Sequence, residues 1–243
     1  MRTSNKIVLG IILAPLVALS SLHVALFAKY KSGNYVSMKT VQQDRFDRPA
    51  LKNIDNIEVY GLENFSITPA DSFAIEIEKS KYGHLHYTVK GNSLVIHGDS
   101  IIQHPDGTTD VMRSNENVNL YLPSVKNIIA DNSDVRLKGS KDSSKAGSYH
   151  FSLLHAAGFK IEENGWQDST YKYFKGLTIH ADHSGNIEIP AYTHIAELNL
   201  TMLESQFIDN DAQIGKLTID VDKKSSVTLK GDNLKKLNLV KQP

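Results

Sequence analysis

The sequence has no cysteine. Disulfides, thiolate metal ligands, a cysteine nucleophile and a lipidated N-terminal cysteine are therefore excluded. It also lacks an excess of charge of either sign, because 27 Lys and Arg residues balance 27 Asp and Glu residues. A dedicated nucleic-acid-binding protein depends on surplus basic side chains that neutralise phosphates. We therefore expect no nucleic-acid partner.

Catalytic signatures are missing as well. The sequence contains no G-x-S-x-G, no H-E-x-x-H and no glycine-rich phosphate loop. The adjacent carboxylates Glu162 and Glu163 would point to opposite faces of a strand, unlike the facing acid pair of a glycosidase. We therefore predict that the protein is not an enzyme, with no catalytic residue and no cofactor.

A long apolar run is present at the N-terminus. Residues 7–28 carry no formal charge and, as a helix, would extend about 33 Å, enough to cross a bilayer core of about 30 Å. A cleaved signal peptide is the alternative, with Arg2 and Lys6 as its basic start and cleavage after Ser20. The apolar run continues past Ser20 to Ala28, which favours an uncleaved single-pass membrane anchor.

The orientation of this anchor rests on two opposing signals. Basic residues are more numerous after the apolar run than before it, which would keep the rest of the chain in the cytoplasm. Long domains are translocated largely regardless of such charges, and the start resembles an export signal. We expect the C-terminal part outside, in the periplasm or on the surface, with a basic tip (1–6), an anchor (7–28), a linker (29–52) and a domain (53–243).

From residue 54 onward, apolar residues alternate with polar ones, as they do along one face of a strand. Turn-forming residues, such as the Lys-Gly-Asn of 90–92 and the Pro-Asp-Gly of 105–107, separate the alternating runs. No helical stripe of any length follows Ala28. This pattern predicts an all-β domain.

The second half repeats about every 20 residues. The tripeptides Leu-Thr-Ile (177–179), Leu-Asn-Leu (198–200), Leu-Thr-Ile (217–219) and Leu-Asn-Leu (237–239) are joined by spacings of 21, 19 and 20. A second series, at 187–189, 207 and 227–229, falls between them. A β-sandwich also places strands at such intervals, but the recurrence in one register favours stacked coils. We predict a single-stranded, right-handed β-helix, or β-solenoid.

Four stretches carry a family resemblance: IDNIEVYGLENFSITPADSFAIEIE (54–78), GNSLVIHG (91–98), VNLYLPSVKNIIADNSDVRLKG (118–139) and LTIHADHSGNIEIP (177–190). They resemble the auto-transporter adhesin head GIN domain family of exported bacterial proteins, over residues 54–240. The resemblance implies a β-helix-like exported domain and transfers no catalytic residue. One departure is the stretch 130–133, where the family often has a Ser-Gly pair; the second copy, Ser184 and Gly185, is kept.

The strongest binding candidate is the aromatic stretch at 165–174. Trp166, Tyr171 and Tyr173 stand there beside polar residues, and exposed aromatic side chains offer rigid contact area for sugars or proteins. In the alternative interpretation, Tyr173 and Phe174 begin the next strand and Trp166 covers the core.

His84 and His86 would share one face of a strand, as two ligands of a metal do. Without a third ligand at a useful spacing, we predict no metal site.

Together these features predict a membrane-anchored, extracytoplasmic β-solenoid that acts as a non-catalytic binding or structural module at the cell envelope. Its expected partners are the membrane and an envelope polysaccharide or protein, and the pattern does not predict an oligomeric state. Two rival hypotheses are a polysaccharide-active β-helix enzyme and a ligand or metal sensor.

Overall fold

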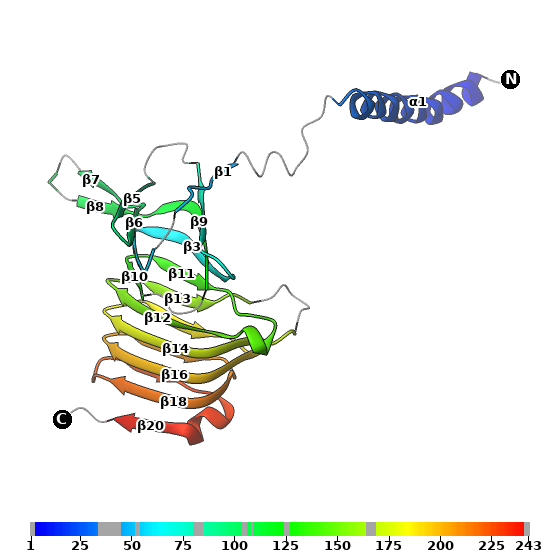
Figure 1. Ribbon diagram of the computed structural model, residues 1–243. Coiled ribbons are helices and arrows are strands. Elements are labelled where there is room, and N and C mark those ends of the chain that lie inside the picture. The colour runs from blue at the N-terminus through cyan, green and yellow to red at the C-terminus, as the bar shows by residue number, and fades with distance from the viewer. Residues whose placement is uncertain are drawn as a thin grey trace. The chain divides into compact units, whose positions relative to one another are not determined.

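The computed structural model describes residues 3–33, 45–51, 54–79, 85–103, 106–107, 109–123, 127–163 and 169–240. The chain divides into two compact units, Met1–Arg45 and Phe46–Pro243. The first unit contains helix α1 (Thr3–Lys31), and the second is mostly β-structure (Figure 1). The prediction of a β domain preceded by one apolar helix is confirmed.

Helix α1 includes the whole of the predicted apolar segment. Its part Leu13–Lys31 is long and apolar enough to cross a membrane. The few polar side chains bond to carbonyl oxygens one turn earlier: Ser20 Oγ donates to Leu16 at 2.8 Å and Ser21 Oγ to Val17 at 2.7 Å. His23 Nδ1 lies 2.9 Å from the carbonyl oxygen of Leu19. These polar groups are thus satisfied within the helix, as an apolar environment requires.

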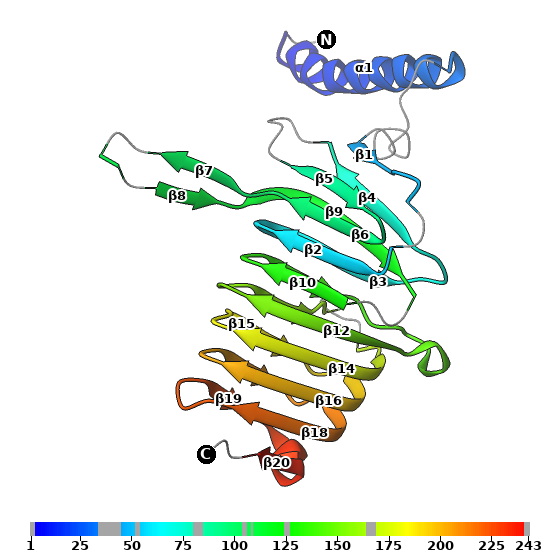
Figure 2. The same ribbon diagram turned by 60° about the vertical axis from the view of Figure 1, so that its left-hand side comes forward.

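Within the described residues, the second unit has two nine-stranded sheets and a separate two-stranded hairpin. Sheet A has the spatial order β1 (Phe46–Asp47), β4 (Ala74–Glu78), β9 (Ser114–Leu122), β3 (Leu62–Pro69), β11 (Asp134–Leu137), β13 (Gly158–Ile161), β15 (Asn186–Ile189), β17 (Gln206–Asp209) and β19 (Ser226–Thr228). Sheet B has the order β20 (Leu237–Val240), β18 (Gln213–Val221), β16 (Thr193–Leu203), β14 (Lys172–Asp182), β12 (Gly147–Leu154), β10 (Asn127–Asp131), β2 (Asn56–Tyr60), β6 (Ser93–His97) and β5 (His86–Lys90). The hairpin is β7 (Ser100–Gln103) with β8 (Thr109–Met112), and it projects from the sheets (Figure 2).

From β9 to β20 the chain passes alternately from one sheet to the other. From β10 to β18, each strand pairs in parallel with the strand two later in the chain. The recurring tripeptides lie side by side, because Leu177 pairs with Leu198, Leu198 with Leu217, and Leu217 with Leu237. In sheet A, Ile187 pairs with Phe207 and Phe207 with Val227. The predicted register of the repeat is confirmed.

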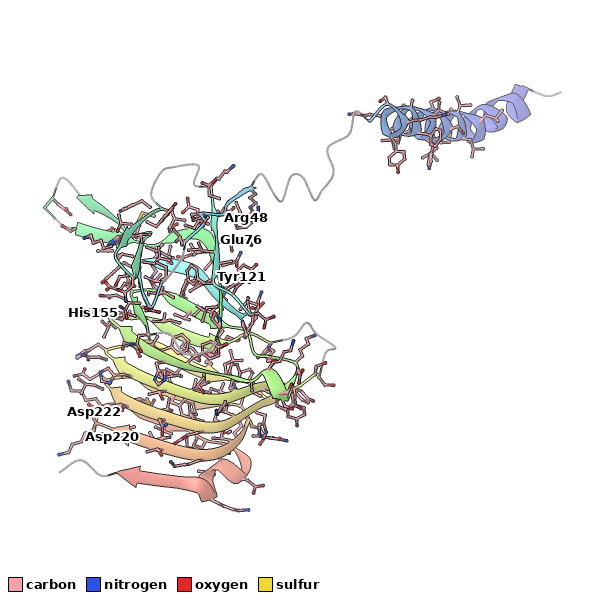
Figure 3. All side chains as sticks on the ribbon, viewed as in Figure 1. Arg48, Glu76, Tyr121, His155, Asp220 and Asp222 are labelled. Atoms are coloured by element: carbon pink, nitrogen blue, oxygen red, sulfur yellow. The ribbon has the colours of Figure 1, made fainter. Side chains whose placement is uncertain are left out.

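The N-terminal end of the stack follows a different order. Strand β2 lies between β6 and β10, and β3 lies between β9 and β11, so the earliest coil is inserted among later ones. Antiparallel pairs β4–β9, β1–β4 and β5–β6 close this end, which makes both sheets mixed. Strand β1 falls within the expected linker, and Arg48 next to it bonds to Glu76, which also accepts from Tyr121 (Figure 3).

The core consists of the inward-facing residues of both sheets. Leu177, Ile179 and Ala181 of β14 are fully buried, whereas Thr178 and His180 between them are not. Period-two alternation therefore assigns each side chain to the core or to the outer face, as the sequence pattern predicted.

The two sheets are connected by two sets of turns. We call the turns that lead from sheet B to sheet A the first corner row, and those that lead from sheet A back to sheet B the second corner row. In the first row, left-handed residues recur just after the strands: Gly61, Asn132, His155, His183 and Glu204. His155 and Asp222 mark this row in Figure 3. The second row has turns as short as residues 190–192 and a connection as long as 138–146, which contains the 3₁₀ helix η1 (Ser143–Lys145).

Candidate functional site

Four rings gather in the second corner row. Tyr171 lies 6.4 Å from Tyr173 and 5.7 Å from Tyr192, and Tyr173 lies 5.7 Å from His194, measured between ring centroids. Tyr173 and His194 are each the second residue of a strand, β14 and β16, and Tyr171 and Tyr192 immediately precede those strands. We call these four residues the aromatic corner.

Strand geometry decides which rings are presented to solvent. Tyr173 and His194 are paired across β14 and β16 and are both half-buried on the outer face. Phe174, the next residue, points inward and is 1% exposed. Tyr192 is 50% exposed and has a φ of 57°, a left-handed conformation that is rare for a bulky residue. Tyr173 and Phe174 both lie at the start of β14, as the alternative interpretation expected, and of the two only Phe174 is buried. Tyr171 and Tyr173 are half-buried, and Tyr192 is the exposed ring.

Polar groups adjoin these rings. Gln213 Nε2 donates to Tyr171 Oη at 2.9 Å, and Gln213 Oε1 lies 3.4 Å from His194 Nδ1. A hollow of about 450 Å³ opens here. Its lining consists of Tyr171, His194, Asp211, Ala212, Gln213, Ile214, Gly215, Asp232 and Asn233. The aromatic corner therefore combines ring faces with amide, imidazole and carboxylate groups.

A buried pair of polar residues, Asp209 and Asn233, lies next to this hollow. Asp209 is fully buried, and its carboxylate accepts hydrogen bonds from the Ala212 backbone N–H at 2.8 Å and from Asn233 Nδ2 at 2.8 Å. Asn233 Nδ2 also donates to the Ala212 carbonyl oxygen at 2.7 Å. Asn233 belongs to the 3₁₀ helix η2 (Gly231–Lys236), so the pair ties this helix to the end of β17.

A second, shallow hollow of about 410 Å³ crosses the outer face of sheet B. Glu58, His150 and His180 are among the residues that line it. Glu58 accepts a hydrogen bond from Tyr60 Oη at 2.9 Å. Burial, together with this bond, raises the pKa of Tyr60 to about 12. A carboxylate and two imidazoles on one face are the groups that the rival enzyme hypothesis requires.

Of the predicted histidine pair, the structure describes only His86. His84 lies outside the described residues. His86, on β5, stacks on His97 with centroids 5.3 Å apart, and His97 stacks on Tyr60 at 4.8 Å. The part of the chain that the structure describes contains no group of three or more His, Cys, Asp or Glu residues placed to hold a metal ion.

Trp166 also lies outside the described residues, so its part in the aromatic corner stays a prediction. Sequence reasoning missed Tyr192 and His194. The signal was available, because both follow Tyr171 and Tyr173 by 21 residues, the same step that separates Leu177 from Leu198. Applying the repeat to exposed positions as well as to core positions would have found them.

No model of a known protein family matches the chain, and no curated protein matches it. The GIN domain name is therefore not confirmed. Three solved structures from Parabacteroides are similar at low identity. A provisionally named lipid-binding protein from Parabacteroides distasonis is 12% identical, covers 81% of this chain and 96% of its own, and has a TM-score of 0.33. A provisionally named adhesin from the same species is 10% identical, covers 72% of this chain and 77% of its own, and has a TM-score of 0.36. Another from Parabacteroides merdae is 9% identical, covers 80% of this chain and 92% of its own, and has a TM-score of 0.31.

Proposed function

We propose that this protein is a membrane-anchored, extracytoplasmic binding module whose aromatic corner binds an envelope polysaccharide without cleaving it. The observation that carries this proposal is the set of four rings beside a hollow lined by Gln213, Asp211 and Asn233. A sugar has apolar C–H faces and a rim of hydroxyl groups. Ring faces contact the former, and amide and carboxylate groups bond to the latter.

The properties of helix α1 support the proposal of a membrane anchor. Its side chains between Leu13 and Phe27 are apolar or satisfied by the helix backbone, and Lys29 and Lys31 stand in its last turn. Basic side chains at the end of an apolar helix suit the membrane interface. In this proposal residues 7–28 lie in the bilayer, 29–52 form the linker, and the β domain of 53–243 lies outside the cytoplasm.

The alternation of strands between the two sheets supports a right-handed β-solenoid as the scaffold. The inward residues of each coil pack across the coil, as Phe151 does on Phe159, and also against the neighbouring coils, so the stack is rigid along its length. Rigid elements that hold the rings in place reduce the conformational entropy lost on binding. Tyr173 and His194 are positioned by such paired strands.

Binding of the full-length protein in detergent micelles to soluble peptidoglycan fragments and to neutral capsular oligosaccharides tests this proposal. We expect Tyr171→Ala and Tyr192→Ala to weaken binding about tenfold or more, because each removes a ring contact. Tyr87→Ala is the matched control, since Tyr87 on β5 is 39% exposed outside the corner. Equal binding by all three variants, or no binding of either glycan class, would contradict the proposal.

The same incubation separates binding from cleavage. The proposal predicts no new reducing ends in the glycan after prolonged incubation. Their appearance, and their loss in Glu58→Gln, would favour the polysaccharide-active enzyme and place its chemistry on the outer face of sheet B.

A further inference from the structure

The N-terminal end of the β stack is the end at which the chain arrives from helix α1. Strand β1 is the outermost strand of sheet A there, and β5 is the outermost strand of sheet B, whereas β19 and β20 lie at the opposite end (Figure 2). Residues 32–45 connect α1 to β1, and a chain of that length spans at most about 50 Å. In the proposed function, on whose membrane anchor this inference rests, this end therefore stays close to the bilayer.

The apolar core is open at this end. Tyr87 and Val89 of β5 pair with Ile96 and Leu94 of β6, which are both fully buried. Because residues paired across two strands share a face of the sheet, Tyr87 and Val89 occupy positions on the core side. They nevertheless keep 39% and 42% of their surface exposed. The outermost strand of sheet B thus presents core-side apolar residues to the outside.

The β7–β8 hairpin adds further apolar side chains at this end. It leaves the sheets between β6 and β9 and forms a two-stranded sheet of its own (Figure 1). All four residues of β8 are exposed, and Val111 and Met112 keep 55% and 52% of their surface accessible. A two-stranded hairpin is only marginally stable in water without a surface to pack against. The hairpin would therefore gain stability from an apolar partner outside the chain.

Exposed apolar side chains are unevenly distributed over the β unit. Among the residues that the structure describes there, the large ones are Tyr87, Val89, Val111, Met112, Tyr192, Leu203 and Leu234. The first four lie at the N-terminal end, and we call them the apolar end. Apolar side chains gathered on one part of a surface mark a contact with a protein or a membrane.

The chemistry and the connections of this end favour a lipid surface. A second copy stacked here would have to accommodate two chains arriving at β1, one from each copy. Tyr87 combines an apolar ring with a hydroxyl group, which suits the boundary between acyl chains and headgroups. Strands of four residues are too short to cross a bilayer, and exposed Asp110 within β8 excludes a deep position. The expected contact is therefore interfacial.

We infer that the apolar end is a second membrane contact, which rests at the level of the lipid headgroups of the bilayer that holds α1. The anchor gives this contact a high effective concentration, so a weak affinity is sufficient. Strand β14, which carries Tyr173 of the aromatic corner, lies five strand spacings from β5, or about 24 Å. The contact therefore holds the aromatic corner at a fixed height above the lipid.

Fluorescence quenching by lipid-attached nitroxides tests this inference in the full-length protein, reconstituted into vesicles of phosphatidylcholine and phosphatidylglycerol. Because the chain has no cysteine, one introduced cysteine takes an environment-sensitive dye at a single known position. Met112→Cys and Val89→Cys report on the apolar end. Leu234→Cys is the matched control, since Leu234 is also an exposed apolar residue but belongs to η2 at the opposite end. We expect nitroxides near the headgroups to quench the first two dyes at least about threefold more strongly than the third.

A dye on Val17→Cys in α1, read with nitroxides deep in the acyl chains, reports on the anchor, so the two proposals can fail separately. Quenching at Val17 without excess quenching at Met112 and Val89 would overturn the inference and leave the anchor intact. Quenching at Met112 and Val89 without quenching at Val17 would refute the anchor and support the lipid contact. Dyes at Met112 and Val89 that are shielded from water but not quenched would overturn the inference, because a protein surface would then cover this end.

Discussion

The two corner rows connect the same two sheets but are built differently. The first row turns repeatedly through a left-handed residue, such as Asn132, His183 or Glu204. The second row ranges from three-residue turns such as 190–192 to the nine-residue connection 138–146, and it holds the aromatic corner with its hollow. In the proposed function, the first row serves the scaffold and the second row carries the ligand site.

Hydrogen bonds explain why the first row is regular. Ser205 Oγ accepts from the Ser184 backbone N–H at 3.2 Å, and Ser225 Oγ accepts from the Ser205 backbone N–H at 3.1 Å. Each serine therefore satisfies the backbone of the preceding coil and fixes the position of the next turn. An insertion here would leave buried N–H groups unpaired. The second row has loops whose length can vary without breaking such a ladder.

The largest effect should come from the one buried carboxylate described in the second row. Asp209→Ala leaves the Ala212 N–H and the Asn233 amide without their acceptor, so we expect a loss of about 3 kcal/mol in the free energy of unfolding. Urea denaturation measures it. Asp232→Ala is the control, since its exposed ion pair with Lys235 should contribute less than about 1 kcal/mol. Equal losses in both variants would show that Asp209 does not hold this corner.

A substitution in the first row, Ser205→Ala, should have a smaller effect on the free energy of unfolding. Ser205 is buried, and its hydroxyl donates to the Leu203 carbonyl oxygen at 2.8 Å and accepts from Ser184. Ser205→Ala should reduce the free energy of unfolding by about 1–2 kcal/mol and leave oligosaccharide binding unchanged. Ser226→Ala, at an exposed position of β19, should change neither. Loss of binding in Ser205→Ala with little loss of stability would reverse the division of roles between the rows.

The smallest effect on stability should come from His183, and it should depend on pH. His183 Nδ1 lies 2.6 Å from Asp182 Oδ1, and its Nε2 lies 3.4 Å from Glu204 Oε1, which also binds Lys224. The hydrogen bond to Asp182 raises the pKa of His183 above its usual range. The imidazolium therefore stabilises the fold below pH about 6.5, and this contribution is lost as the pH rises through the folded-state pKa.

His183→Gln removes this contribution, and Tm measured against pH tests it. We expect the wild type to have the higher Tm near pH 6 and the difference between the two curves to shrink as the pH rises through the folded-state pKa of His183. A difference that grows toward alkaline pH would contradict the assigned pKa direction.

Much of the scaffold could be predicted, because the core obeys two simple periods. Alternation identified inward residues such as Leu177 and Ile187, and the 20-residue step gave their pairing. The insertion of β2 between β6 and β10 could not be predicted, since it depends on which of several similar edges pair. The hollow beside the aromatic corner also needed coordinates, because its lining joins Tyr171 and Asn233, which are far apart in the sequence.

The central claim is that ligands bind at the second corner row. Backbone amide chemical shifts of the full-length protein in micelles, followed during titration with a neutral capsular oligosaccharide, test it most directly. The account predicts shifts at Tyr192, Gln213 and their neighbours, with His183 and Glu204 unaffected. Shifts confined to His183, Glu204 and the rest of the first row would contradict it.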